Sequence, residues 1–150
     1  MRVVLTTVLN ASVTIDNKVY SQIDRGFCLL VGFTHTDDQK IVDKMIDKIL
    51  SLRVFADEKG LTNLSIYDVK GQIMSVSQFT LYADTSGGRR PSFTNAMKPD
   101  QAKELYAYFN KQLEAKFGPI ATGIFGADMK VSSVNDGPFK VLLDSEELFK

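Results

Sequence analysis

A polar segment inside an apolar stretch is the first part of this sequence that could do chemistry. Ser75-Val76-Ser77-Gln78-Phe79-Thr80-Leu81 places four polar side chains in a run that otherwise looks like a buried strand. A buried polar group without a partner costs about 1–3 kcal/mol, so these groups need hydrogen bonds. Strand pleating would put Gln78 and Thr80 on one face, and Ser77 and Phe79 on the other. The segment indicates either a pocket lined by hydroxyls and backbone N–H groups, or a half-exposed strand with its polar face in water.

A second segment, Asn135-Asp136-Gly137-Pro138, combines two residues with unusual backbone behaviour. Glycine allows another molecule to approach the main chain closely, whereas proline lacks a donor and can follow a cis peptide bond. The segment can be interpreted as a plain turn between two strands. It can also be interpreted as a rigid corner with a functional role, and the local sequence leaves both interpretations open.

Two arginines on a glycine-containing loop form a third candidate. Gly87-Gly88-Arg89-Arg90-Pro91 is not expected in a regular element, because adjacent glycines and a proline disfavour one. A guanidinium pairs well with phosphate or carboxylate, so Arg89 and Arg90 suit an anionic ligand. A loop that is merely solvated explains the same residues equally well.

The residue types on which many catalytic sites depend occur only once here. His35 is the only histidine and Cys28 the only cysteine, so we expect no metal site and no cofactor. A catalytic triad would have to use His35, which is explained more simply as a surface loop residue at a strand end. Cys28 has apolar neighbours and is expected to be a buried, unreactive thiol. The sequence contains no Walker, Rossmann or Gly-x-Ser-x-Gly motif.

Length and charge favour a single domain over residues 1–150 without an extended basic face. The chain has 18 Lys+Arg and 18 Asp+Glu, so its formal net charge is zero. Nucleic acid could then be contacted only through a local basic patch. No signal segment and no apolar run of about 18 residues is visible, and we therefore expect a cytoplasmic protein without membrane association.

Hydrophobic patterning predicts an α/β protein of the α+β type, with mixed or antiparallel sheets and two main helices. The helices are expected over 38–52, with a capping box of Thr36 and Gln39, and over 99–117, beginning at Pro99. The order of elements lacks regular β-α-β alternation, which argues against a doubly wound parallel sheet. Strands are expected over 2–8, 11–15, 19–23, 27–34, 73–82, 128–134 and 139–143.

At these segments the chain resembles the D-aminoacyl-tRNA deacylase family. The resemblance covers essentially residues 1–144 and rests on several motifs in the family's order. These motifs are Leu52-Arg53-Val54-Phe55, Asn63-Leu64-Ser65, Ser77-Gln78-Phe79-Thr80-Leu81, Arg90-Pro91-Ser92-Phe93, Gly123-Ile124-Phe125-Gly126-Ala127-Asp128-Met129 and Asn135-Asp136-Gly137-Pro138. The resemblance implies the barrel-like fold of that family. It also implies hydrolysis of the ester bond of D-aminoacyl-tRNA, and of glycyl-tRNA mischarged on tRNA-Ala.

The resemblance further implies a homodimer in which each pocket is built from both chains. The catalytic segment of Ser77, Gln78, Phe79 and Thr80 would come from one subunit, and a cis Gly137-Pro138 corner from the other. Backbone carbonyls of that corner would occupy the place of an L side chain, so the site would be selective because it excludes the L enantiomer. The implied substrate-binding and chiral-filter residues are Phe125, Ala127, Met129, Asn135, Gly137 and Pro138, with Arg89 and Arg90 on the tRNA path.

The residues themselves agree with a site built from backbone groups. An aminoacyl ester is already reactive, and the N–H groups of Phe79 and Thr80 could hold its carbonyl oxygen as negative charge develops. The 2′-hydroxyl of the substrate could help to activate water, which would explain why no catalytic histidine is needed. Thr80 as a covalent nucleophile is the alternative. It lacks a candidate base nearby in sequence, so we expect its hydroxyl to position the substrate instead.

The chain departs from the family pattern at three places. Thr6-Thr7 stands where the family carries Gln-Arg, whose arginine would brace the Gly-Pro corner. Lys140 replaces a threonine, and Leu61-Thr62 replaces Lys-Met. We expect weaker chiral discrimination or altered tRNA contact, with an unchanged fold. Two other functions stay open: a non-catalytic module that binds the acceptor end of tRNA, and an esterase for small activated esters.

Overall fold

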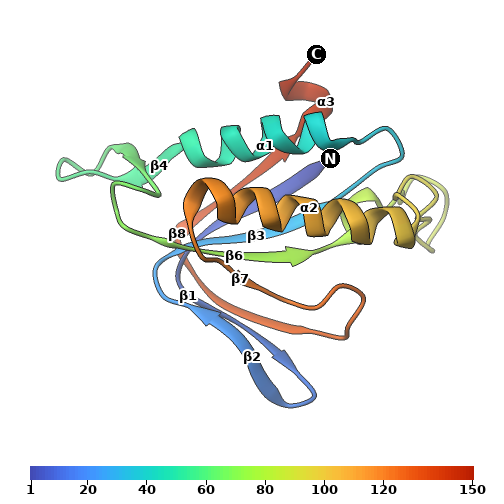
Figure 1. Cartoon of the computed structure of the whole chain (residues 1–150), viewed down its shortest axis with the longest axis horizontal. Helices are drawn as coiled ribbons and strands as arrows, with labels where there is room; N and C mark the ends of the chain where they lie inside the picture. Colours follow the sequence, from blue (N-terminus) through green and yellow to red (C-terminus); the bar gives the residue numbers. More distant parts are fainter.

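The computed structural model describes residues 1–150 and has a six-stranded mixed sheet at its centre (Figure 1). In chain order the elements are β1 (Arg2–Ile15), β2 (Lys18–Ile23), β3 (Gly26–Gly32), α1 (Gln39–Ser51), β4 (Arg53–Ala56), β5 (Thr62–Ser65), β6 (Gln72–Ser77), the 3₁₀ turn η1 (Phe79–Tyr82), α2 (Pro99–Phe117), β7 (Ala121–Thr122), β8 (Lys130–Asp144) and α3 (Ser145–Leu148).

The long strand β1 decides the shape of the sheet. Its first half lies between β3 and β8, and its second half lies between β2 and β8, all antiparallel. On the other side of β3 the sheet continues through β6 and β7, and these pairings are parallel. The sheet therefore bends at β1 into the barrel-like form that the family resemblance implies.

Helices α1 and α2 cover one face of the sheet, and both begin at the end where β3 and β6 finish (Figure 1). The apolar stripe of α1 explains this packing, because Val42, Met45, Ile46 and Ile49 are completely buried against the sheet and α2. The opposite face of the sheet, which we call the helix-free face, carries a smaller core where β1 and β2 curl over it. That core contains Val8, Ala11, Val13, Ile23, Cys28, Met74 and Val76.

Two predicted boundaries are wrong at places that matter for the site. The strand expected over 73–82 ends at Ser77, and η1 follows it. A short apolar run does not distinguish a strand from a helical turn, and the chain leaves the sheet where β3 also ends. The segment 135–138 is not a turn between two strands. It lies inside β8, whose register against β1 shifts there.

The other differences are smaller. The strands expected over 2–8 and 11–15 form one continuous strand. The capping box of Thr36 and Gln39 is wrong, because the N-cap of α1 is Asp38, whose carboxylate accepts a backbone N–H of the first turn at 2.9 Å. Helix α2 spans the predicted residues. The β4–β5 pair, β7 and α3 were not predicted, because such short elements carry little periodicity.

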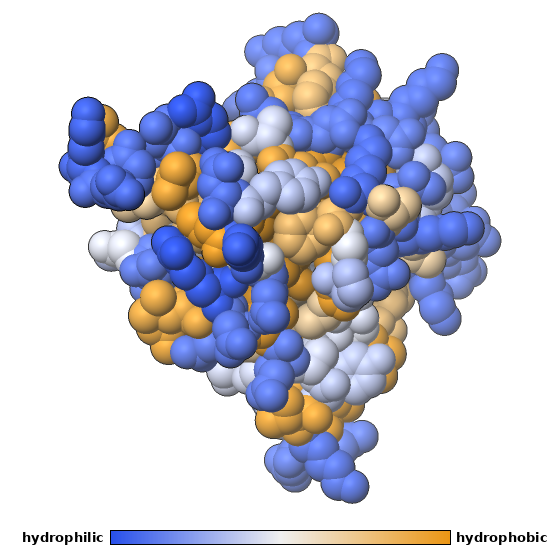
Figure 2. Space-filling view, turned by 60° about the vertical axis from the view of Figure 1, so that its left-hand side comes forward, coloured by the Kyte–Doolittle hydropathy of each residue, from blue (hydrophilic) through white to orange (hydrophobic).

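The surface is dominated by charged and polar side chains. The view that brings the β4 end of the molecule forward shows mostly polar side chains, with smaller apolar patches between them and at parts of the outline (Figure 2). No helix in the structure has both the length and the apolar character that crossing a membrane requires.

Candidate active site

The polar segment forms a turn at the carboxyl ends of two parallel strands. β3 ends at Gly32 and β6 ends at Ser77, and these ends meet at one edge of the sheet because the strands are parallel. The turn η1 follows immediately, with Phe79 56% exposed and Thr80 also exposed. Residues that follow the carboxyl ends of parallel strands are exposed at this edge of the sheet, and ligands commonly bind there.

Two backbone donors at the start of η1 have no partner within the turn. The N–H of Gln78 donates to the carbonyl oxygen of Val31 at 2.7 Å, and the turn's own bonds begin with Leu81 N–H to Gln78 O at 3.3 Å. The N–H groups of Phe79 and Thr80 lie between these bonds and are the free donors that a helical turn leaves at its start. Such a pair is suited to hold an oxygen that gains negative charge.

The hydroxyl of Thr80 has an amide as its neighbour and no base. Gln78 Nε2 donates to Thr80 Oγ1, and a carboxamide is too weak a base to deprotonate a hydroxyl. His35 is engaged elsewhere, with its Nε2 2.7 Å from the carbonyl oxygen of Thr94. The geometry therefore favours a positioning role for this hydroxyl over nucleophilic attack.

Close packing beneath η1 fixes the turn on the sheet. A Cβ atom on Gly32 would lie 2.7 Å from the carbonyl oxygen of Gln78 and 3.1 Å from Leu81 Cβ, so this approach requires glycine. Ser75 is completely buried and donates to the Tyr106 hydroxyl at 3.3 Å, which in turn donates to the Ser75 carbonyl oxygen at 2.8 Å. Burial raises the pKa of Tyr106, which further favours the protonated phenol that donates this bond.

The arginine loop is attached beside the turn. Residues at its two ends exchange backbone hydrogen bonds of 2.7 and 2.9 Å, which close the loop that carries Arg89 and Arg90. Phe93, next to this closure, packs against Phe79 with ring centroids 5.1 Å apart and the rings tilted edge to face. Both arginines are exposed, and neither forms an ion pair within the chain. The loop that carries these two cations is therefore closed beside an exposed aromatic ring.

The Gly137–Pro138 corner is held by two hydrogen bonds from within the chain. Its peptide bond is cis, Gly137 has a φ of 128°, and both residues are exposed. Thr7, only 4% exposed, donates from Oγ1 to the carbonyl oxygen of Asp136 at 2.9 Å. The side-chain oxygen of Asn135 accepts a backbone N–H just beyond the proline at 3.0 Å. Thr7, one of the positions where the chain departs from the family pattern, therefore contacts the corner directly.

Within one chain the corner and the η1 turn do not meet. Thr7 contacts the corner, whereas Arg2 contacts the carbonyl oxygen of Leu81 in η1 at 2.9 Å. Arg2 and Thr7 are separated by 5 positions on β1, which is about 17 Å at the usual rise of a strand. A pocket that uses both the turn and the corner would therefore need a second copy of the chain.

The remaining predicted site residues lie on the connection between β7 and β8. The ring of Phe125 lies 6.1 Å from the ring of Tyr106, which itself contacts β6 below the turn. Met129 packs against the smaller core, and Ala127 is half-buried. The structure thus brings Phe125 toward the strand that carries Ser77, and it leaves Ala127 and Met129 farther along the connection.

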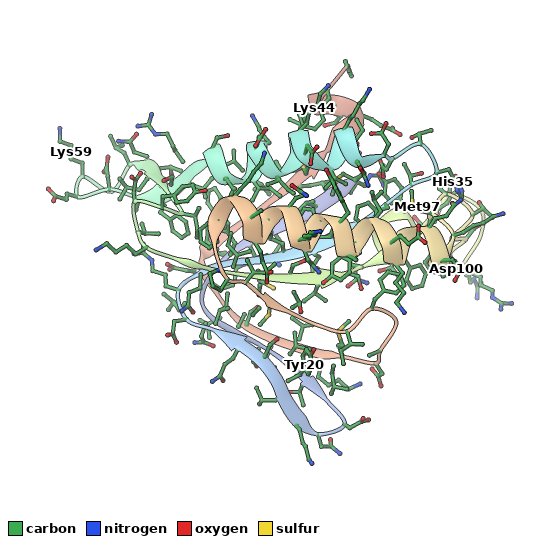
Figure 3. The ribbon with its side chains drawn as sticks, viewed as in Figure 1. Tyr20, His35, Lys44, Lys59, Met97 and Asp100 are labelled. Carbon is green, nitrogen blue, oxygen red and sulfur yellow. The ribbon has the colours of Figure 1, made fainter.

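A separate cleft of about 300 Å³ contains none of the predicted site residues. Its lining includes His35, Met97 and the carboxylates of Asp37 and Glu104, and it contains no lysine or arginine. Figure 3 shows His35 and Met97 near Asp100, where α2 begins. Because its carboxylates would repel a phosphate backbone, this cleft is a poorer candidate for an RNA ligand than the surface around η1.

The single cysteine lies inside the protein, away from solvent. Cys28 is 5% exposed, which confirms the buried thiol, and burial raises its pKa. No three His, Cys, Asp or Glu side chains are grouped so that they could hold a metal ion. Sequence reasoning missed Arg2 and Gly32, which contact η1 from β1 and β3, and Tyr106, whose hydroxyl bonds to Ser75 in β6 before the turn. Only Gly32 had a local signal in the sequence, because it is a glycine within the apolar run 27–34.

Comparison with known proteins identifies relatives that match nearly the whole chain. Residues 4–144 match the model of the family described as D-Tyr-tRNA(Tyr) deacylase. The D-aminoacyl-tRNA deacylase of Lactobacillus acidophilus is 54% identical over 144 residues, covering 96% of this chain and 99% of that protein. The protein of the same name from Lactobacillus gasseri is 55% identical, with the same coverage.

Two solved structures share the architecture. The structure titled c-Myc DNA Unwinding Element Binding Protein superposes with a TM-score of 0.91 at 41% identity, covering 96% of this chain and 98% of that one. The structure titled as a probable eukaryotic D-amino acid tRNA deacylase gives a TM-score of 0.80 at 16% identity, covering 95% and 97%. At that lower identity the second comparison shows the fold alone.

Proposed function

The chain belongs to the D-Tyr-tRNA(Tyr) deacylase family, and we propose that its η1 turn is the catalytic centre of the family's reaction. The protein is a hydrolase that cleaves the carboxylic ester bond of D-aminoacyl-tRNA. The observation that carries the proposal is the pair of free N–H groups of Phe79 and Thr80 on an exposed turn. The one side chain hydrogen-bonded to the Thr80 hydroxyl is the Gln78 amide, so the hydrogen bonds of the turn include no nucleophile–base pair.

In the proposed reaction the two N–H groups hold the ester carbonyl oxygen. Water adds to the carbonyl carbon, the bond from that carbon to the ribose oxygen breaks, and the products are the free amino acid and tRNA. The neighbouring 2′-hydroxyl of the substrate assists the water, in place of a protein base. One such donor typically contributes about 10²–10³ in rate, so the pair can supply much of the catalysis.

The exposed ring of Phe79 offers a surface for the terminal base of the tRNA. Base stacking on an aromatic side chain contributes about 1–3 kcal/mol and tolerates any base. The edge-to-face contact with Phe93 holds the ring in place. Arg89 and Arg90 would contact nearby phosphates, which suits a protein whose formal net charge is zero and whose basic contacts must be local.

We also propose that the pocket is completed by a second copy of the chain. The helix-free face beside η1 carries an uncovered apolar row, in which Leu142 is 62% exposed and lies across Val4 from Leu30. Covering this row in a homodimer would bury apolar surface next to the turn. The exposed Gly137–Pro138 corner of the partner could then reach the turn, which the corner of the same chain cannot do.

A partner corner in that position would select substrates by their chirality. Its main chain would occupy the space of an L side chain and leave that of a D side chain open. A glycyl ester has no side chain to exclude, so we expect glycyl-tRNA to be hydrolysed as well. Such a substrate is available where translation occurs, and we therefore propose a cytoplasmic location.

Single-turnover deacylation of one tRNA charged with a D-amino acid, its L form or glycine tests the proposed function. We expect hydrolysis of the D and glycyl esters and protection of the L ester. The Thr80→Ala variant should retain measurable turnover, because we assign its hydroxyl a positioning role. Abolished turnover with intact tRNA binding would instead indicate a nucleophile. Binding of charged tRNA by the wild type without release of any amino acid would indicate a non-catalytic module.

Sedimentation of two charge-introducing variants tests the dimer. Leu142→Glu should yield monomers and lose protection of the L ester. Leu148→Glu is the matched control, because Leu148 is exposed but lies on α3, which stands beyond α1 and away from the helix-free face (Figure 1). A wild-type protein that sediments as a monomer while still protecting the L ester would contradict the shared pocket.

A further inference from the structure

Arg2 binds groups on η1 and on β8 at the edge of the sheet where the turn lies. Its Nη1 donates to the carbonyl oxygen of Leu81 at 2.9 Å, and its Nε donates to Oδ2 of Asp144 at 2.8 Å. Its guanidinium carbon lies 4.6 Å from the centre of the Tyr82 ring. Leu81 and Tyr82 form the second half of the turn whose first half carries the donors of Phe79 and Thr80.

The strand register brings these partners together. Arg2 on β1 stands between Gly32 on β3 and Asp144 on β8, as their direct Cα partner. Gly32 contacts the turn from β3, so η1 is held from two neighbouring strands at once. Asp144 is 8% exposed and also accepts the N–H of Glu146 at 3.0 Å, which fixes the carboxylate that orients Arg2.

Each of these interactions uses a property that a lysine lacks. A planar guanidinium can donate to two acceptors in fixed directions while its face lies on an aromatic ring, whereas an ammonium is a flexible point charge. The carbonyl of Leu81 is at the end of a 3₁₀ turn, where carbonyl groups have no partner within the turn. The Tyr82 ring beneath is buried, and its hydroxyl has no hydrogen-bond partner, so the ring is held mainly by packing and by Arg2.

We propose that Arg2 is a positioning residue that fixes the η1 turn, and thereby the direction of the Phe79 and Thr80 N–H groups; this rests on the proposed function of that turn. The four residues of η1 form little more than one 3₁₀ turn, with a rise of about 2 Å per residue, so its two halves are in direct contact. A tilt of its second half therefore moves the donors of its first half. Donors to an oxyanion act at about 2.7–3.1 Å, so a displacement of a few tenths of an ångström weakens both.

The test compares Arg2→Gln and Arg2→Lys with Lys116→Gln. The control removes a different ion pair, Lys116 to Asp47, whose side chains are 38% and 66% exposed and lie on the helices away from the turn. A hydrogen bond to a charged group is worth roughly a tenfold to hundredfold factor, so we expect Arg2→Gln to lower the single-turnover rate by about tenfold or more. Binding of D-aminoacyl-tRNA should change by less than about threefold. Arg2→Lys should recover part of the rate, and Lys116→Gln should not lower it.

The amide resonances of Phe79 and Thr80 give a readout that does not depend on activity. We expect these resonances to shift in Arg2→Gln and to stay unchanged in Lys116→Gln. If Arg2→Gln, or Arg2→Lys should the first variant not fold, keeps both the wild-type rate and these resonances, the positioning role is refuted. If the wild type releases no amino acid although the Arg2 variants shift the resonances, the proposed function fails and the positioning of the turn stands.

Discussion

Replacement of Thr7 by valine tests whether one hydroxyl controls the chirality of the reaction. Valine keeps the shape of the side chain and removes only the donor that Thr7 Oγ1 provides to the carbonyl oxygen of Asp136, at 2.9 Å. Thr7 is 4% exposed and Asp136 is half-buried, so water can only partly replace the missing donor. The variant therefore keeps its fold but loosens the corner at one point.

The expected magnitude follows from the burial of this bond. Leaving a buried acceptor without a partner costs about 1–3 kcal/mol, and the half-exposed carbonyl places the cost near the lower end. About 1 kcal/mol corresponds to roughly a fivefold change in an equilibrium or rate ratio. We therefore expect the ratio of D-ester to L-ester hydrolysis to fall about fivefold in Thr7→Val, mainly through faster hydrolysis of the L ester.

The assay is single-turnover deacylation of matched D- and L-aminoacyl-tRNA, with unfolding by urea measured in parallel. Thr7→Ser keeps the hydroxyl and should keep the selectivity. Thr6→Val is the matched control, because Thr6 is a neighbouring buried threonine that makes no hydrogen bond to the corner. If Thr7→Val loses stability but keeps the wild-type D to L ratio, or if Thr6→Val changes that ratio equally, the hydroxyl has only a structural role.

The site and its supports give three further predictions. Gly32→Ala should lower the single-turnover rate more than it lowers tRNA binding, because the added Cβ would lie only 2.7 Å from the Gln78 carbonyl oxygen and would displace it; an unchanged rate would contradict the close packing. The double variant Arg89→Ala, Arg90→Ala should reduce the salt dependence of kcat/KM, by about 0.7–0.9 in log–log slope for each phosphate that the protein no longer neutralises; an unchanged slope would place the RNA elsewhere. Burial opposes ionisation of Asp144, but the bonds from Arg2 and a backbone N–H hold its pKa below the ordinary 3.8. The ionised carboxylate therefore stabilises the fold at pH values above 3.8, and this contribution is lost as the pH falls through the lowered pKa of the folded state. Asp144→Asn should consequently lose less free energy of unfolding than the wild type when the pH is lowered from about 5 to about 3.

The sequence alone determined the parts of this protein that depend on local pattern. The apolar spacing over 99–117 defined α2 at its observed bounds, since helix periodicity and an N-terminal proline are properties of neighbouring residues. The scarcity of histidine and cysteine directed attention to backbone groups, and the motif at 77–81 located the turn. The shape of that segment was predicted incorrectly as a strand, because an apolar run of this length fits either geometry.

Only the tertiary structure decided how the turn is supported and where the corner lies. Arg2 meets Leu81 across 79 positions of the chain and Asp144 across 142, and no spacing rule connects residues so far apart. The substitution of the family's arginine by Thr7 suggested a weakened corner, yet the fold places the shorter hydroxyl within reach of the Asp136 carbonyl oxygen. Local pattern fixes which elements form, whereas the register between strands fixes which side chains become neighbours, and the support of this site depends on that register.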